Sequence, residues 1–127
     1  MLLPECKVRP HVNQIECHTR CAQQELVTFC QAKEIQCVAY SPIAGSDLEA
    51  PLLVSTGARH SKSAAAVVLR WLLQRGIVVI PCSSKPSRIA TNRLEADGWE
   101  LSADEVEGLF ALDEPERSAE RVWAKIL

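Results

Sequence analysis

Aromatic residues and long apolar runs are both scarce in this 127-residue chain. Phenylalanine, tyrosine and tryptophan together make up 5% of the residues, and no basic block interleaves with them. That combination argues against nucleic acid as the main partner. No apolar run approaches the roughly 20 residues of a membrane-spanning helix, and the formal net charge is only −2. These absences favour an ordinary globular domain.

Two further absences concern processing and metal binding. The first residues, Met1 to Pro4, are too few for a signal peptide and carry no basic region, so we expect a cytosolic location. The six cysteines form no CxxC pair, and no second ligand pair stands at zinc-finger spacing. Several cysteines have apolar neighbours, as Cys30 and Cys37 do, which is typical of buried free thiols. We therefore expect neither a metal site nor a disulfide framework.

The length fits one domain, with hydrophobic and charged fractions of 47% and 24% that are typical of soluble proteins. The apolar pattern of the sequence predicts strands at 11–17, 35–40 and 77–80, with Val12 and Ile15 as packing residues. Strand 77–80 is entirely β-branched, which suits a strand covered on both faces. Strands separated by helices are parallel, so a ligand site is expected at their C-terminal ends.

The helices between these strands follow from apolar spacing and end signals. In the helix predicted over 23–33, Leu26, Phe29 and Cys30 share one apolar face. A short helix is expected over 52–60. Ser63 is a predicted N-cap for a helix over 64–75 that ends at Gly76. Ser102 with Glu105 forms a predicted capping box for a last helix.

The segment from Gly76 to Asn92 reads as a glycine stop, a strand, a polar loop and a new helix. Pro86 suits the first turn of that helix, and Arg88 and Asn92 share one of its faces. Serines, a lysine and an arginine near a helix N-terminus predict an anion site. An ordinary strand–helix turn with a solvated basic residue is the alternative.

Three segments of the chain, in this order, resemble the aldo-keto reductase family. They are Val12–His18 (VNQIECH), Ala39–Pro42 (AYSP) and Val78–Asn92 (VVIPCSSKPSRIATN), similar to the family's sixth, seventh and eighth strands with their loops. The resemblance implies an α/β fold of parallel βα units forming the C-terminal part of a TIM (β/α)8 barrel, incomplete in this chain. It implies one partial domain over 1–127, with 1–112 matching the family and 113–127 a divergent tail.

The resemblance also implies a cofactor and the residues that hold it. The family transfers hydride from NADPH to the carbonyl carbon of aldehydes or ketones. The resemblance implies that Gln14 hydrogen-bonds the nicotinamide carboxamide and that Tyr40 stacks on the nicotinamide ring. It implies that Ser41 contacts the pyrophosphate. Ser83 and Arg88 would bind the adenosine 2′-phosphate, and Asn92 the adenine. A tyrosine offers a flat amphipathic platform, and an arginine grips phosphate with two parallel hydrogen bonds.

Departures from the family pattern matter as much as the matches. Cys82 stands where the family usually carries a lysine that pairs with the 2′-phosphate, so NADH is an alternative cofactor. The catalytic Asp, Tyr, Lys and His of the family have no counterpart here, because the only tyrosine is Tyr40. We therefore expect no catalytic residue and no independent reductase activity.

Several alternatives stay open at this point. A complementary N-terminal barrel portion would supply the missing catalytic groups. Without it, the chain is a non-catalytic nucleotide-binding or interaction module, a half-barrel that dimerises through its open edges, or a decayed, truncated product. The residues that usually cap this helix in the family are also replaced. Ala22 stands at the start of the helix predicted over 23–33, and Glu34 stands at its end.

Overall fold

A computed structural model of the chain describes residues 6–93 and 98–116. It contains three parallel strands in the order β1-β2-β3: β1 (Val12–Glu16), β2 (Gln36–Tyr40) and β3 (Val78–Val79). The helices are α1 (Gln24–Ala32), α2 (Pro51–Arg59), α3 (Ala64–Gln74), α4 (Pro86–Thr91), α5 (Ala103–Gly108) and the 3-10 helix η2 (Leu109–Leu112). The predicted βα order and parallel pairing are confirmed, whereas residues 117–127 of the predicted tail lie outside the described residues.

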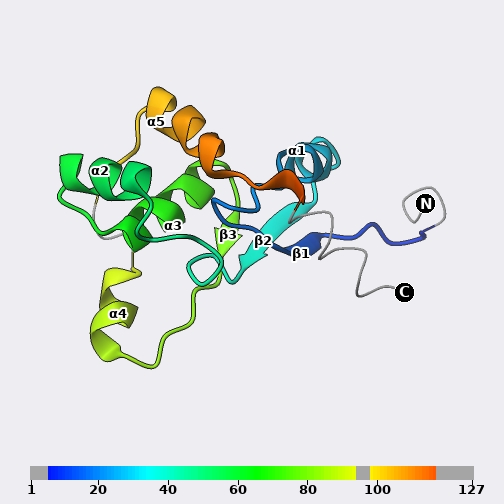
Figure 1. Cartoon of the computed structure of the whole chain (residues 1–127). Coiled ribbons are helices and arrows are strands. Elements are labelled where there is room, and N and C mark those ends of the chain that lie inside the picture. Colours follow the sequence, from blue (N-terminus) through cyan, green and yellow to red (C-terminus); the bar gives the residue numbers. More distant parts are fainter. Residues whose placement is uncertain (1–5, 94–97, 117–127) are drawn as a thin grey trace.

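In the part of the chain that the structure describes, the sheet is covered on one face only. Helix α1 packs against β2 and α3 against β3, while α4 stands away from the sheet at the end of an extended loop (Figure 1). On the sheet face that the helices cover, Cys37, Ala39 and Ile77 are at most 2% exposed. On the opposite face Val12, Val78 and Ile80 are 55%, 44% and 45% exposed.

Two sequence predictions are wrong for this reason. Strand 77–80 is not covered on both faces, because Val78 and Ile80 face away from the single helix layer. Val12 is likewise not a packing residue within the described structure, although Ile15 packs against the core. The β-branched residues therefore mark a second face that residues 6–93 and 98–116 do not cover.

The apolar face of α1 is also rotated from the predicted one. Val27 and Cys30 are each 2% exposed, and Leu26 packs at the edge of the core. Phe29 is 46% exposed, so its predicted packing role is wrong. Positions two apart lie on nearly opposite sides of a helix, so burying Val27 turns Phe29 outward.

Trp71 of α3 is the centre of the core. Its side chain is fully buried, and its indole N–H donates to the Val106 carbonyl at 2.9 Å. Phe110 meets the indole edge-on at a centroid distance of 5.1 Å, and the Arg75 guanidinium lies 4.2 Å from the ring centroid. Arg75 also donates to the Ala22 carbonyl at 2.7 Å. One cluster thus joins α3, the start of α1 and the α5–η2 segment.

Both ends of α3 and the start of α5 follow the predicted signals, whereas both ends of α1 are strained. Ser63 caps α3 through Ala66 N–H, and Ser102 with Glu105 forms the predicted capping box of α5. Gly76 ends α3 with φ +73. Gln23 and Glu34, at the two ends of α1, have φ of 52 and 54. A non-glycine residue in this region costs about 1 kcal/mol, so α1 carries strain at both ends.

Glu105 joins α5 to the end of α2. Its carboxylate accepts from Arg59 Nη2 at 2.8 Å and from the Ser102 N–H at 2.9 Å, and its Oε2 lies 2.9 Å from His60 Nε2. Burial acts to raise the pKa of Glu105, but the hydrogen bonds from Ser102, His60 and Arg59 outweigh it and lower the pKa to about 2. The folded state therefore favours the carboxylate.

We predict that Glu105→Gln lowers the free energy of unfolding at neutral pH by about 1 kcal/mol, as for a networked surface ion pair. The contribution of the carboxylate is fully present above its ordinary pKa of 4.5 and is lost as the pH falls toward 2. Urea unfolding at several pH values should show a flatter acid limb for this variant. Glu107→Gln, on the exposed side of α5, is the control, and an equal effect of both variants would contradict the prediction.

Position 45 requires a glycine because the backbone there passes close to the His18 ring. The imidazole of His18 is fully buried, and its Nε2 lies 3.1 Å from Glu16 Oε1. A Cβ at position 45 would collide with this ring. The loop after β2 therefore closes over the end of β1 only if residue 45 has no side chain.

Gly45→Ala should destabilise the fold by about 1–3 kcal/mol, the usual cost of overpacking a buried site. The matched control is Gly108→Ala, where a Cβ meets no heavy atom within 4 Å. That change in a helix should raise stability by up to about 1 kcal/mol. The thermal unfolding midpoints of the two variants test this prediction. Equal midpoints would show that the close approach of residue 45 to His18 does not limit the stability of the fold.

Candidate functional site

Two predicted site residues, Gln14 and Tyr40, lie on the uncovered face of the sheet. Gln14 pairs in register with Val38, two residues before Tyr40 on the neighbouring strand. Gln14 is exposed, and Tyr40 is 39% exposed at the last position of β2. The structure therefore brings an amide and a phenol ring to one face, close to the C-terminal ends of β1 and β2.

Ser41 continues from β2 in a strained conformation. Its φ is 52, a left-handed value that is uncommon for a residue with a side chain. The Ser41 carbonyl accepts from the Gly45 N–H at 3.2 Å, and Ser46 Oγ donates to the Pro42 carbonyl at 3.1 Å. Strain held in place by surrounding bonds is a feature of functional loops. Ser41 is exposed beside Tyr40.

The remaining predicted residues lie beyond β3. Ser83 Oγ accepts from the Lys85 N–H at 3.1 Å, and Pro86 occupies the first turn of α4 as predicted. Arg88 is exposed and forms no ion pair with any residue in 6–93 and 98–116. Asn92 is the half-buried C-cap of α4. Since α4 has only six residues, any attraction for an anion rests on Arg88 and Lys85 more than on a helix dipole.

A hollow beside α4 adds residues that the sequence reasoning missed. It measures about 420 Å³ and lies between α4 and the N-terminus of α3. Its lining consists of Ser61, Lys62, Ser63, Ala66, Ala90 and Thr91. Lys62 Nζ lies 5.8 Å from the centroid of a Trp99 ring. The hollow thus combines hydroxyls, an ammonium group and two small apolar side chains next to Asn92. A cation directly before the N-cap Ser63 was the available sequence signal.

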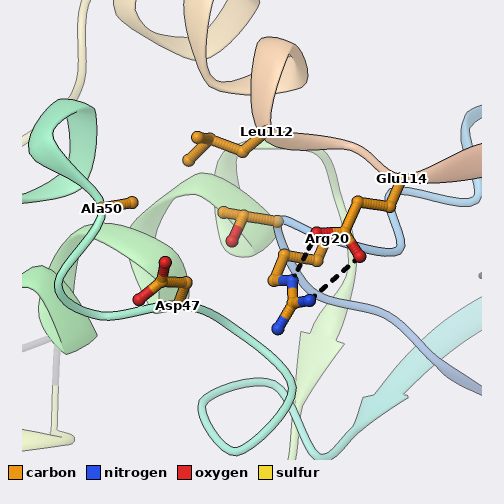
Figure 2. A pocket seen from close by; sticks show the side chains of 6 residues that line it. Arg20, Asp47, Ala50, Leu112 and Glu114 are labelled. Atoms are coloured by element: carbon orange, nitrogen blue, oxygen red, sulfur yellow. Dashed lines mark hydrogen bonds and ion pairs between the residues drawn. The ribbon is translucent and has the colours of Figure 1, made fainter.

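A second hollow, of about 180 Å³, lies near the loop after β1 (Figure 2). Arg20 donates from Nε and Nη2 to the two Glu114 oxygens at 2.7 and 3.0 Å. The hydrogen bonds to Glu114 raise the pKa of Arg20. The Ala22 N–H donates to Asp113 Oδ1 at 2.8 Å. Residues 113 and 114, predicted as part of a divergent tail, are thus hydrogen-bonded to this loop. The Arg20–Glu114 ion pair lies within the lining of the hollow.

The cysteines are arranged for packing. Cys17, Cys21, Cys30 and Cys37 are buried, as predicted for Cys30 and Cys37, and no disulfide joins the cysteines of the described residues. Burial raises the pKa of Cys17 to about 12 and that of Cys37 to about 11. Burial therefore disfavours the thiolate, the form that binds metals and acts as a nucleophile, at both positions. Within the described ranges, no three His, Cys, Asp or Glu residues are grouped to hold a metal.

The described helices include none that is long and apolar enough to cross a bilayer.

Comparison with known proteins gives a consistent result. A profile of the aldo/keto reductase family matches residues 2–114. Glyoxal reductase of Bacillus subtilis is 41% identical over 117 residues, covering 91% of this chain and 42% of that protein. Human aldo-keto reductase family 1 member A1 is 37% identical over 123 residues, covering 88% of this chain and 38% of that protein. The chain therefore spans about two fifths of the length of these relatives.

Solved structures agree with the sequence matches. A mutant of Gox0644 in complex with NADPH superposes with a TM-score of 0.82 at 34% identity, over 90% of this chain and 42% of that one. The aldo-keto reductase AKR2E5 complexed with NADPH gives 0.80 at 33% identity, over 90% and 38%. The three parallel strands match part of a TIM barrel in these enzymes. This chain belongs to the aldo/keto reductase family, of which it forms a partial oxidoreductase domain.

Proposed function

We propose that this chain is the C-terminal, cofactor-binding part of an NADPH-dependent aldo-keto reductase barrel, acting on aldehydes or ketones once the barrel is complete. The observation that carries the proposal is the shared face of Gln14 and Tyr40, at the C-terminal ends of two parallel strands. Parallel barrels bind their ligands at that end. Two family members that match this chain were solved in complex with NADPH.

The residues present fit a dinucleotide in three chemical respects. The exposed Tyr40 ring gives a flat surface for an aromatic ring, and the Gln14 amide both donates and accepts beside it. The exposed guanidinium of Arg88 is available for a phosphate, with Ser83 nearby in sequence. The hollow that Thr91 and Lys62 line, next to Asn92, offers room for a heterocycle.

When bound, NADPH supplies the hydride that reduces a carbonyl carbon. The role of this chain is to hold and orient: Tyr40 presents one ring face, Gln14 fixes the amide end, and Ser41 contacts the phosphate bridge. The proton for the carbonyl oxygen comes from groups outside this chain, because its residues include no second tyrosine. The chain by itself therefore binds without turnover.

Titrating NADPH against the purified chain tests the proposal. We expect saturable binding, which Arg88→Ala weakens by about tenfold or more because a charge-assisted hydrogen bond to phosphate is lost. Arg93→Ala is the control, since Arg93 is an equally charged, exposed residue just past α4. No saturation at about 10 mM cofactor, which corresponds to under about 3 kcal/mol of binding, contradicts the proposal. So does an equal loss in both variants.

Cys82→Lys should raise affinity for NADPH and not for NADH. Cys82 is exposed in the loop before α4, and an ammonium there adds a charge near the proposed 2′-phosphate position, which only NADPH carries. The gain should be about tenfold for a partly screened pair. The two cofactors are compared by calorimetry on the same sample. A gain shared equally by NADH would show that the loop does not discriminate the phosphate.

A further inference from the structure

A tight turn follows β1 and is held by contacts at both of its central residues. The backbone N–H groups of His18 and Cys21 donate to each other's carbonyls at 3.2 and 2.9 Å, which leaves Thr19 and Arg20 at the centre of the turn. Arg20 pairs with Glu114 of the C-terminal segment (Figure 2). Thr19 is fully buried. The conformation of the turn is therefore fixed before any ligand binds.

The buried Thr19 hydroxyl begins a chain of two hydrogen bonds. Thr19 Oγ1 donates to Ser46 Oγ at 3.1 Å, and Ser46 Oγ donates to the Pro42 carbonyl at 3.1 Å. Because the Ser46 oxygen accepts the first bond, its own proton is available for the second. Ser46 lies 27 residues after Thr19, so these two bonds join the turn after β1 to the loop after β2.

The loop that these hydroxyls reach contains the strained Ser41. Ser41 has a φ of 52, and its carbonyl accepts from the Gly45 N–H at 3.2 Å. The next residue, Pro42, is fully buried. A residue with a side chain keeps a left-handed conformation only where its surroundings hold it. The bond from Ser46 to the Pro42 carbonyl supplies such a hold directly after Ser41.

We propose that Thr19 and Ser46 are positioning residues for the cofactor pyrophosphate and act through Ser41. The proposal rests on the proposed function, in which Ser41 contacts the phosphate bridge. The two hydroxyls keep the Ser41 backbone in its left-handed conformation in the free chain. A loop that is already ordered raises affinity, because binding does not then have to order it.

A simpler role for the Thr19 hydroxyl is to satisfy its own burial, because a buried hydroxyl needs a partner wherever it lies. Thr56 shows this simpler case. It is 1% exposed, and its Oγ1 accepts from Arg59 Nη2 at 3.1 Å within the same helix, α2. Thr19 differs because its bond reaches a second loop. Thr56 is therefore the matched control for a buried hydroxyl without a role in positioning.

Thr19→Val removes the hydroxyl and keeps the shape of the side chain. We expect this variant to bind NADPH about fivefold more weakly, as for the loss of one neutral hydrogen bond. Its affinity for adenosine 2′-monophosphate should be unchanged, because that probe has no pyrophosphate. Thr19→Ser keeps a hydroxyl and should restore NADPH affinity, whereas Thr56→Val should alter neither affinity. Calorimetry compares the two ligands on each variant, and circular dichroism shows whether each variant is folded.

Amide hydrogen exchange tests the loop without any cofactor. In the free chain, Thr19→Val and Ser46→Ala should each speed exchange of the Gly45 amide by about fivefold, because the loop that holds its bond to Ser41 opens more often. The double variant should be no faster than Ser46→Ala alone, since both hydroxyls belong to one chain of bonds.

Three results overturn the proposal. They are unchanged exchange at Gly45 in Thr19→Val, an equal loss of affinity for both ligands in that variant, and an equal loss of NADPH affinity in Thr56→Val. Failure of the unmodified chain to bind NADPH overturns the proposed function instead. The exchange rates then still decide whether the hydroxyls of Thr19 and Ser46 hold the loop.

Discussion

One-sided burial governs the arrangement of this structure. Three short parallel strands are held by a single helix layer, and the core that joins them is centred on Trp71. Arg75 stacks on Trp71 and on Phe110 and also reaches the Ala22 carbonyl, so one side chain ties the start of α1 to α3 and η2. Among the described residues, no element covers the other face of the sheet. Gln14 and Tyr40 of the candidate site lie on that open face.

The ends of the strands determine how the residues of the candidate site are arranged. Parallel pairing sets Gln14 and Tyr40 on one face of the sheet. The strained Ser41 loop closes behind Tyr40, and Gly45 lets that loop approach His18. Beyond β3, Arg88 and the hollow near Lys62 are carried by α4, which has no buried residue of its own. Packing therefore fixes the ring and amide end of the site more firmly than its phosphate end.

Much of the fold was readable from the sequence because its signals are local. Ser63 and Ser102 cap their helices as predicted, Gly76 takes the positive φ of a helix end, and Pro86 begins α4. The errors concern which side of an element is covered. Phe29 and Val78 are apolar, but composition does not say whether a covering layer is present. In the candidate site, Lys62 was missed because its place beside α4 depends on packing between residues far apart in sequence. The roles of Gln14, Tyr40, Ser41, Ser83, Arg88 and Asn92 toward a cofactor stay predictions.

The central proposal is that Ser83, Arg88 and Asn92 hold the adenosine 2′-phosphate end of a nicotinamide cofactor. Chemical-shift mapping with adenosine 2′,5′-bisphosphate is the sharpest test, because this probe carries the 2′-phosphate and the adenine without the redox ring. The proposed site predicts saturable shifts of the amides of Ser83, Arg88 and Asn92, with Glu114 unmoved. Shifts confined to the hollow between Arg20 and Glu114, or no saturable shifts at all, would contradict it.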